Sequence, residues 1–241
     1  MSARVRIGTS GWHYPHWKGR FYPAGLRPAE QLAHYARTFD TVEVNNSFYK
    51  LPTAAAVTTW RASVPAAFTF AVKASRYLTH MKKLADPAEP LARFLPVVEG
   101  LGPQLGPILF QLPPRWRANP GRLAALLALL PARHRYAFEL RDPSWWTPAI
   151  EALLAAHGVA QCVHDIEGEV SPLVVTARFV YVRLHGPGEK YRGRYGADAI
   201  AAWAGRVRAW RARGLDAYVY FDNDEAGYAA LDARELLAAV G

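Results

Sequence analysis

The sequence predicts an α/β protein that folds as a single (β/α)8 TIM-like barrel, in one domain over residues 1–241. Short runs rich in β-branched and aromatic residues alternate with Ala/Leu-rich stretches of helical spacing along the chain. Eight strand candidates in 241 residues give one βα unit per roughly 30 residues, the size of one crossover unit. No glycine-rich dinucleotide loop follows the first strand, which favours the closed barrel over an open doubly wound sheet.

Each of the eight expected strands is a short run of Val, Ile, Leu, Phe and Tyr. Such near-continuous apolar runs are typical of strands that are buried on both faces of a parallel sheet. In chain order the expected strands are 4–10, 41–48, 68–75, 106–113, 135–142, 159–165, 179–186 and 217–224.

Seven helices are expected between and after these strands. Pro87 and Pro120 stand near first-turn positions, where the missing N–H costs nothing, and Gly158 and Gly214 follow apolar helical runs as C-terminal caps do. Pro172 interrupts the segment after the sixth strand, which predicts a short or missing sixth helix. The expected helices are 28–38, 54–63, 87–100, 119–130, 147–157, 198–213 and 225–239.

Composition excludes several classes of protein. A chain that is 51% hydrophobic and 12% aromatic can bury a core, so it is not disordered as a whole. The longest apolar run, residues 123–130, is far below the roughly 20 residues of a membrane span. The first residues lack the apolar segment of a signal peptide, which predicts a cytoplasmic protein. A single cysteine, Cys162, allows no internal disulfide and no cysteine-based zinc site.

Polar residues gather at the carboxyl ends of the expected strands, where a buried parallel sheet should be apolar. Active sites of this barrel fold lie at that end, so the pattern predicts a polar mouth. The alternative is a buried ion-pair network that only fills the top of the barrel. The residues are Glu43, Asn45, Lys73, Gln111, Glu139, Arg141, His164, Asp165, Arg183, His185, Asp222 and Asn223.

Glu43 and Glu139 are the candidate acid–base pair of a hydrolytic reaction, with Lys73 as a third catalytic residue. The alternative is that Glu43 pairs with Lys73 and Glu139 with Arg141. The residues expected to bind substrate are Asn45, Arg141, Arg183, His185, Asp165, Asp222, Asn223, Tyr191, Trp12 and Tyr14.

Three cations at this mouth, together with the net charge of +9, predict a small anionic or polyhydroxylated ligand. The glycine-rich loop 186–196 has the composition of a lid over that ligand. The same cations would repel a metal ion, so no metal is expected. No cofactor and no membrane partner is expected either. The rival hypotheses are a nucleic-acid-binding protein, a metal-dependent nuclease on the same scaffold, and a barrel without catalysis that serves as a binding scaffold.

Seven segments together resemble the YecE-like family, the family numbered seventy-two among the domains of unknown function. The resemblance covers residues 5–240 and implies a TIM-barrel-like fold without an established activity. Asp222 stands where the family often has the first of two asparagines, and His164 where it commonly has a small apolar residue. In order, the segments are IGTSGWHYPHWKGRFYP, FDTVEVNNSFYKLP, FAVKASRYLTHMKKL, LGPILFQLPP, FELRDPSWW, YVRLHGPGEKYRGRYG and VYFDND.

Overall fold

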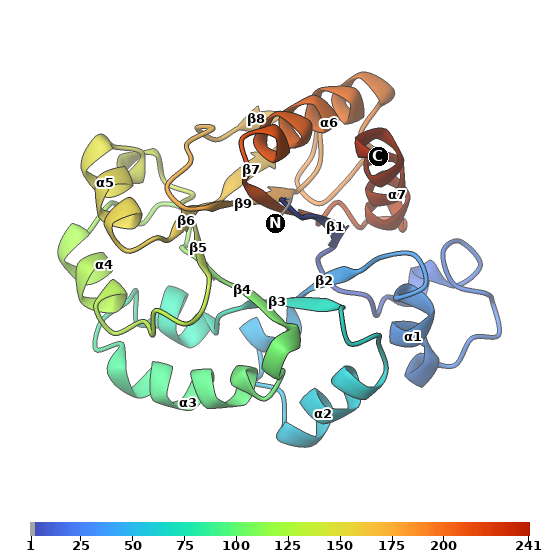
Figure 1. Ribbon diagram of the computed structural model, residues 1–241, viewed down its shortest axis with the longest axis horizontal. Helices are drawn as coiled ribbons and strands as arrows, with labels where there is room; N and C mark the ends of the chain where they lie inside the picture. Colours follow the sequence, from blue (N-terminus) through green and yellow to red (C-terminus); the bar gives the residue numbers. More distant parts are fainter. Residues whose placement is uncertain (1–2) are drawn as a thin grey trace.

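The computed structural model describes residues 3–241, in which ten strands form two five-stranded sheets with helices around them (Figure 1). The predicted α/β class is confirmed. The strands are β1 (Val5–Thr9), β2 (Thr41–Val44), β3 (Thr69–Lys73), β4 (Leu105–Gln111), β5 (Tyr136–Glu139), β6 (Ala160–Gln161), β7 (Val163–Ile166), β8 (Glu169–Val170), β9 (Phe179–Leu184) and β10 (Asp216–Phe221).

One sheet has the order β1-β10-β9-β7-β8 and the other the order β2-β3-β4-β5-β6. All neighbouring strands are parallel except β7 and β8, which form an antiparallel hairpin. A single closed barrel is therefore not confirmed, because the hydrogen-bonded ladder runs in two separate parts. The expected sixth strand is divided at Cys162, so that β6 pairs with β5 while β7 pairs with β9.

The two sheets meet at the junction of β1 and β2. Ser10 forms an isolated parallel bridge with Glu43, and the Gly11 N–H donates to the Glu43 carbonyl at 2.8 Å. Gly8 permits this close approach, because a Cβ there would lie 2.4 Å from the Thr41 carbonyl oxygen.

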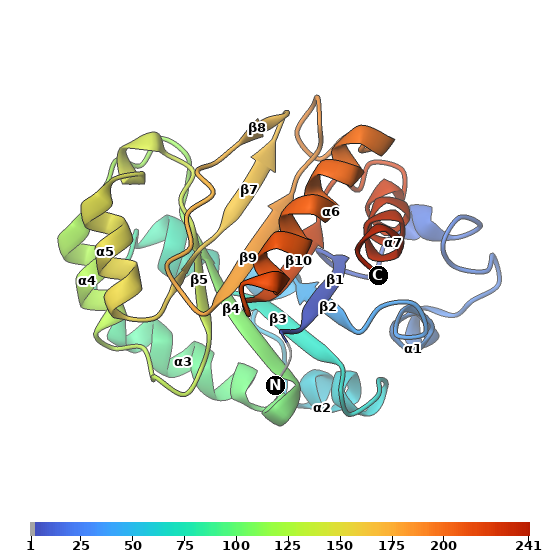
Figure 2. The ribbon, with the colours of Figure 1, turned by 45° about the horizontal axis from the view of Figure 1, so that its top comes forward.

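The α-helices lie on the outer side of the two sheets, as the views in Figures 1 and 2 show. Residues 171–178 contain no helix, so the sixth helix is missing, as Pro172 predicted. The helices are α1 (Gln31–Tyr35), α2 (Ala54–Ala62), α3 (Ala88–Glu99), α4 (Pro120–Leu127), α5 (Pro148–Ala156), α6 (Ala197–Ala212) and α7 (Tyr228–Val240).

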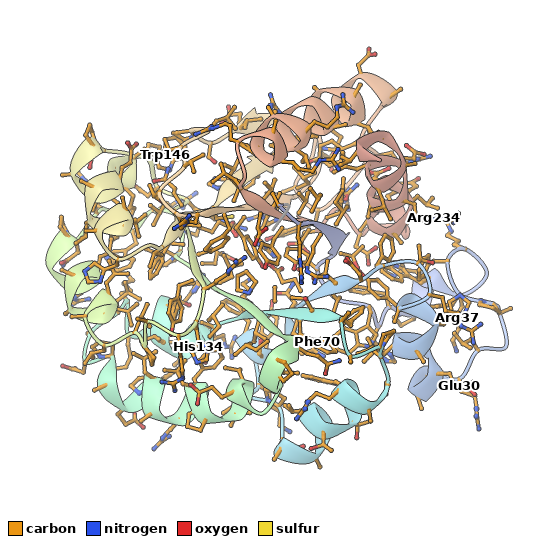
Figure 3. All side chains as sticks on the ribbon, viewed as in Figure 1. Glu30, Arg37, Phe70, His134, Trp146 and Arg234 are labelled. Atoms are coloured by element: carbon orange, nitrogen blue, oxygen red, sulfur yellow. The ribbon has the colours of Figure 1, made fainter. Side chains whose placement is uncertain are left out.

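The apolar core has two parts. The larger part packs the outer faces of the strands against the helices. The smaller part consists of inner side chains of the strands, and Figure 3 shows side chains filling the space between the two sheets. Its buried members are Ala71, Leu109, Ala137, Ala160, Cys162, Phe179, Tyr181, Tyr218 and Tyr220.

The inner core positions the polar strand ends. Successive side chains on a strand point to opposite faces, so a residue two positions after an inner residue also points inward. Lys73, Gln111, Glu139, Arg183 and Asp222 each follow an inner-core residue by two positions. The polar groups therefore form the next layer above the apolar one. Among residues 3–241, no helix combines the length and apolar character that a bilayer crossing needs.

Candidate functional site

Arg183 lies at the centre of the polar layer, with its side chain fully buried in β9. Its guanidinium pairs with Glu43 at 2.8 Å, with Glu139 at 2.7 Å and with Asp222 at 3.0 Å. Glu43 and Glu139 come from one sheet, whereas Arg183 belongs to the other and Asp222 directly follows β10. One guanidinium therefore joins three carboxylates across both sheets.

Glu43 and Glu139 are themselves fully buried, and all four of their carboxylate oxygens have partners. Glu43 accepts from the Ser10 hydroxyl at 2.5 Å and from the Tyr181 hydroxyl at 2.6 Å, in addition to Arg183. The oxygen of Glu139 that Arg183 does not occupy accepts from Arg141 Nε at 2.5 Å. Neither carboxylate has a free oxygen for a substrate, so an acid–base pair gains no support from this geometry.

The predicted alternative, a buried ion-pair network, describes these two residues better. Glu139 does pair with Arg141. The expected pair of Glu43 and Lys73 is not among the ion pairs within residues 3–241, and Arg183 takes the place of the lysine. Arg183 can take this place because its guanidinium presents several donors in a planar fork and binds both carboxylates at once.

The cations keep the network ionised. Burial acts to raise the pKa of Glu139, but Arg141 and Arg183 outweigh it and hold that pKa well below the ordinary value of 4.5. Burial likewise opposes ionisation of Asp222, and Arg183 and His185 lower the pKa of Asp222 to about 2. Both groups are therefore carboxylates at neutral pH and are unsuited to donate a proton.

His185 lies between the cations and Asp222. Its Nε2 is 3.3 Å from Arg141 Nη2 and from Arg183 Nη1, two groups that can only donate. Its Nδ1 is 3.0 Å from Asp222 Oδ2. Nε2 is also 3.3 Å from Glu139 Oε1, so each ring nitrogen lies next to a carboxylate as well as near the guanidinium groups. His185 orients Asp222 and the guanidinium groups, and it is fully buried itself.

A cavity of about 580 Å³ opens next to this network, at the carboxyl ends of β3, β4 and β5. Its volume lies within the range of small-ligand sites. Four of its lining residues are cations and none is a carboxylate. The lining consists of Phe48, Tyr49, Lys73, Arg76, His80, Met81, Gln111, Pro114, Arg141, Lys190 and Tyr191.

Lys73 differs from the other cations of the cavity because it is buried and has a lowered pKa. Its side chain is 7% exposed, and Nζ lies 4.2 Å from the centre of the Phe48 ring. No hydrogen bond or ion pair to Lys73 Nζ occurs within residues 3–241. Burial, with Arg183 nearby, lowers the pKa of Lys73 from 10.5 to about 8. The amine is therefore available to a ligand, and a minor fraction of it is neutral at pH 7.

Two uncharged polar side chains complete the cavity wall. Burial, with Lys73 and Arg141 nearby, lowers the pKa of His80 to about 4, so His80 is neutral at pH 7. The amide oxygen of Gln111 is buried and has no hydrogen-bond partner among the described residues. An unpaired buried acceptor is costly, and a ligand hydroxyl or amine in the cavity would satisfy it.

The loop 186–196 covers one side of this cavity. Tyr191 packs edge-on against His185 at 5.5 Å, and its N–H donates to the His185 carbonyl at 2.5 Å. Gly186 makes the turn possible, since its φ is +125° and a Cβ would meet the Glu189 oxygen at 2.4 Å. The loop predicted as a lid thus contributes Lys190 and Tyr191 to the wall.

Eight of the ten residues predicted to bind substrate do not line this cavity: three belong to the ion-pair network, and five lie elsewhere. Trp12, Tyr14 and Asn45 line a separate hollow of about 60 Å³ between the ends of β1 and β2. Asp165 lies near Trp203 of α6, and burial raises the pKa of its carboxyl group. Asn223 is fully buried and donates to the Gly193 carbonyl and to Asp232.

The sequence prediction missed several residues of the cavity. Arg76, His80 and Met81 follow β3 within eight residues, in a segment that includes a π-helical turn at Tyr77–Met81. The only feature of the sequence that could have identified them is their position, because they follow Lys73 at the same end of the sheet. Gln111 was recognised as a polar strand end, but it was not assigned to the site.

Within residues 3–241, no group of three or more His, Cys, Asp and Glu side chains is arranged to hold a metal ion. The acidic side chains of the network are engaged by Arg141 and Arg183.

Comparisons with known proteins agree on one family. The profile described as "Protein of unknown function DUF72" matches residues 6–241. The UPF0759 protein YecE of Escherichia coli is 29% identical over 160 residues, which cover 65% of this chain and 56% of that protein. The chain thus spans little more than half the length of that relative. The UPF0759 protein YunF of Bacillus subtilis is 25% identical over 97% of this chain and 93% of that protein.

Solved structures give the same result. A DUF72 family protein from Thermotoga maritima superimposes with a TM-score of 0.87 at 27% identity, over 98% of each chain. A DUF72 family protein from Enterococcus faecalis gives a TM-score of 0.79 at 19% identity, over 98% of this chain and 95% of that one, which shows the shared fold.

Proposed function

The chain belongs to the DUF72 family of proteins of unknown function, as its YecE-like segments predicted, and we propose that it is an enzyme for a small anionic substrate. In this proposal the substrate binds in the cavity at the carboxyl ends of β3, β4 and β5, and Lys73 exchanges a proton with it. The observation that carries the proposal is a cavity of about 580 Å³ lined by four cations and no carboxylate.

Lys73 has the properties of a general acid or base. With a pKa of about 8, roughly one molecule in ten carries the neutral amine at pH 7, and the remainder carry the acid. Arg141 and Lys190 face the same space and would stabilise negative charge on the substrate. No step in this scheme requires a free carboxylate, and Glu43 and Glu139 serve to hold Arg183.

We also propose that the two sheets act as one barrel domain. In that case the fold supports an active site at this cavity. The Ser10–Glu43 bridge links them at one junction, and only Cys162 separates β6 from β7 at the other. In a barrel of this kind, the carboxyl ends of the strands hold the active site, and Lys73 lies at such an end.

The rim of the cavity indicates what kind of anion would fit. Tyr49 and Met81 are each 67% exposed, and Tyr191 is 40% exposed, although large apolar side chains are usually covered. A substrate with a flat or ring-shaped body could stack on these side chains while its anionic group meets Lys73 and Arg141. Sugar acids and phosphorylated sugars or ring compounds have this chemistry.

Titration with inorganic phosphate tests the binding part. The variant Arg76→Gln/Lys190→Gln removes one exposed and one partly buried cation of the rim, and we expect the Kd measured by calorimetry to rise roughly tenfold. The control variant Arg37→Gln/Arg234→Gln removes the same charge elsewhere, from the segment after α1 and from α7, and should leave the Kd unchanged. Equal weakening in both variants would show that only the net charge matters and would contradict the proposal.

Labelling of Lys73 tests the chemical part. The rate of modification by an amine-reactive reagent, followed at Lys73 by mass spectrometry, should rise with pH around a midpoint near 8 and fall when phosphate is present. Surface lysines supply the internal reference, with midpoints near the ordinary value of about 10.4. A midpoint for Lys73 equal to theirs would remove its proposed role.

Nucleic-acid binding stays the second proposal, because the net charge is +9 and cations and aromatic side chains share the same cavity. Affinity for an oligonucleotide measured against salt distinguishes the two functions. Several phosphate contacts give a steep log–log slope, whereas a pocket for one small ligand gives a shallow slope.

A further inference from the structure

A second basic cavity lies at the opposite end of the strands. It has a volume of about 690 Å³ and is bounded by residues that begin or precede β1, β3, β4, β5, β9 and β10. Five arginines line it: Arg4, Arg6, Arg133, Arg135 and Arg178. None of the residues that line the first cavity lines this one.

Part of this positive charge is neutralised within the protein. Arg6 pairs with Asp40 at 2.7 Å, Arg133 with Glu99 at 2.5 Å, and Arg135 with Asp216 at 2.6 Å. Three carboxylates therefore face five arginines, which leaves an excess of two positive charges. Asp216 is the one carboxylate that itself lines the cavity.

The excess charge belongs to Arg4 and Arg178. Both side chains are exposed, and neither has a hydrogen bond or ion pair from its guanidinium to any residue within 3–241. Arg4 uses only its backbone N–H, which donates to Asp216 at 2.8 Å. Two guanidinium groups with all their donors unused therefore point to a ligand with acceptor oxygens.

Strand order fixes the spacing of these two arginines. Arg4 directly precedes β1 and Arg178 directly precedes β9, and β10 lies between these two strands. Adjacent strands are about 4.8 Å apart, so the two backbones are separated by about 10 Å. With Arg135 between them, the two arginines offer donors over a span longer than one phosphate group, and a chain of phosphates matches that span.

The cavity is held in place by Arg135. This residue precedes β5 of one sheet and reaches Asp216 and the Tyr218 hydroxyl of β10 in the other, at 2.6 Å and 2.9 Å. The floor of the cavity, formed by Arg135, Asp216 and Tyr218, is therefore held by hydrogen bonds between the two sheets. Aromatic residues of the inner core, Tyr181 and Tyr220, are buried between this floor and the Arg183 network.

We propose that the amino-terminal ends of the strands form a second anion site, for a small ligand that carries two or more linked phosphate groups. Arg4 and Arg178 would bind the outer phosphates and Arg135 the inner one. The planar forks of arginine match phosphate oxygens in geometry as well as in charge. The volume suits a molecule of nucleotide size. This site is independent of the function proposed for the first cavity.

Calorimetric titration of the full chain with inorganic tripolyphosphate tests the site. We expect Arg4→Gln/Arg178→Gln to weaken one binding event by at least roughly tenfold. The matched control Arg37→Gln/Arg234→Gln loses the same charge elsewhere and should leave that event unchanged. Arg76→Gln/Lys190→Gln should alter only binding at the first cavity, so that the two sites are separated.

Asp216→Asn supplies a test in the opposite direction, because damage to the fold would not produce tighter binding. It removes the carboxylate that competes for Arg135, and we expect tripolyphosphate to bind more tightly than to the unchanged protein. Weaker binding in this variant would overturn the proposal. Equal loss in the Arg37/Arg234 control would overturn it too, as would binding of a single-stranded oligonucleotide at this face without any binding of tripolyphosphate.

Discussion

At the level of single residues, Arg183 determines whether the polar layer is stable. It is fully buried and is the shared partner of Glu43, Glu139 and Asp222. Arg183→Met would leave Glu43 without any cationic partner at a fully buried position. Breaking a buried pair in this way costs about 3–5 kcal/mol, so we expect the free energy of unfolding in urea to fall by that amount. Arg37→Gln, at an exposed position, should change the same quantity by less than about 0.5 kcal/mol.

Lys73 should show the opposite effect on stability. Its pKa falls from 10.5 to about 8 on folding, so the unfolded chain binds its proton more tightly and folding is penalised below pH 8. Lys73→Met removes this penalty and should raise the free energy of unfolding at pH 7 by about 1–3 kcal/mol while abolishing phosphate binding.

The pH dependence provides the check on Lys73. The stability of the unchanged protein relative to Lys73→Met should rise between pH 8 and pH 10.5, because the folded amine is already neutral there while the unfolded amine still holds its proton. Denaturant midpoints across this range measure the difference. A difference that does not change with pH would mean that Lys73 titrates normally.

At the level of elements, the loop 186–196 depends on one glycine. The φ of Gly186 is +125°, and a Cβ there would meet the Glu189 and Arg192 oxygens at 2.4 and 2.5 Å. Gly186→Ala should therefore move the loop away from His185, weaken phosphate binding and speed tryptic cleavage after Lys190 and Arg192. Gly188→Ala is the matched control, because its Cβ would have no atom within 4 Å. Cleavage at the same rate in both variants would contradict this role.

The elements themselves were largely predictable, and the reason is periodicity. Every expected strand and helix range overlaps an observed element, since apolar runs and helical spacing are local properties of the chain. The strand ends were overestimated: 41–48 was expected and β2 ends at Val44. Asn46–Phe48 forms a 3₁₀ turn there, because pairing with β3 fixes where a strand stops.

The site was only partly predictable. Their place at the carboxyl ends of strands identified Glu139, Arg183 and Lys73 as candidates, but it could not show that Arg183 would occupy the carboxylate oxygens of Glu43. That outcome depends on distances between strands far apart in sequence. Asp165 was predicted to bind substrate because it adjoins His164 in the sequence. It points to the other face of its strand.

At the level of the whole molecule, the polar contacts tie the two sheets together at both ends of the strands. Arg183 of one sheet pairs with Glu43 and Glu139 of the other, and at the opposite end Arg135 pairs with Asp216. If these contacts couple the sheets, neither can open alone, and the chain should unfold in one cooperative transition.

Hydrogen exchange in Arg183→Met tests this coupling. The most protected amides of a cooperative unit exchange through global unfolding, so a loss of stability should reduce their protection equally throughout the unit. Peptides that contain β2 and peptides that contain β9 should therefore lose the same amount of protection, even though the substituted residue lies only in β9. The control Arg37→Gln should leave both unchanged. Loss confined to peptides of β9 and β10 would show that the sheets unfold separately, and would count against the proposal that they act as one barrel.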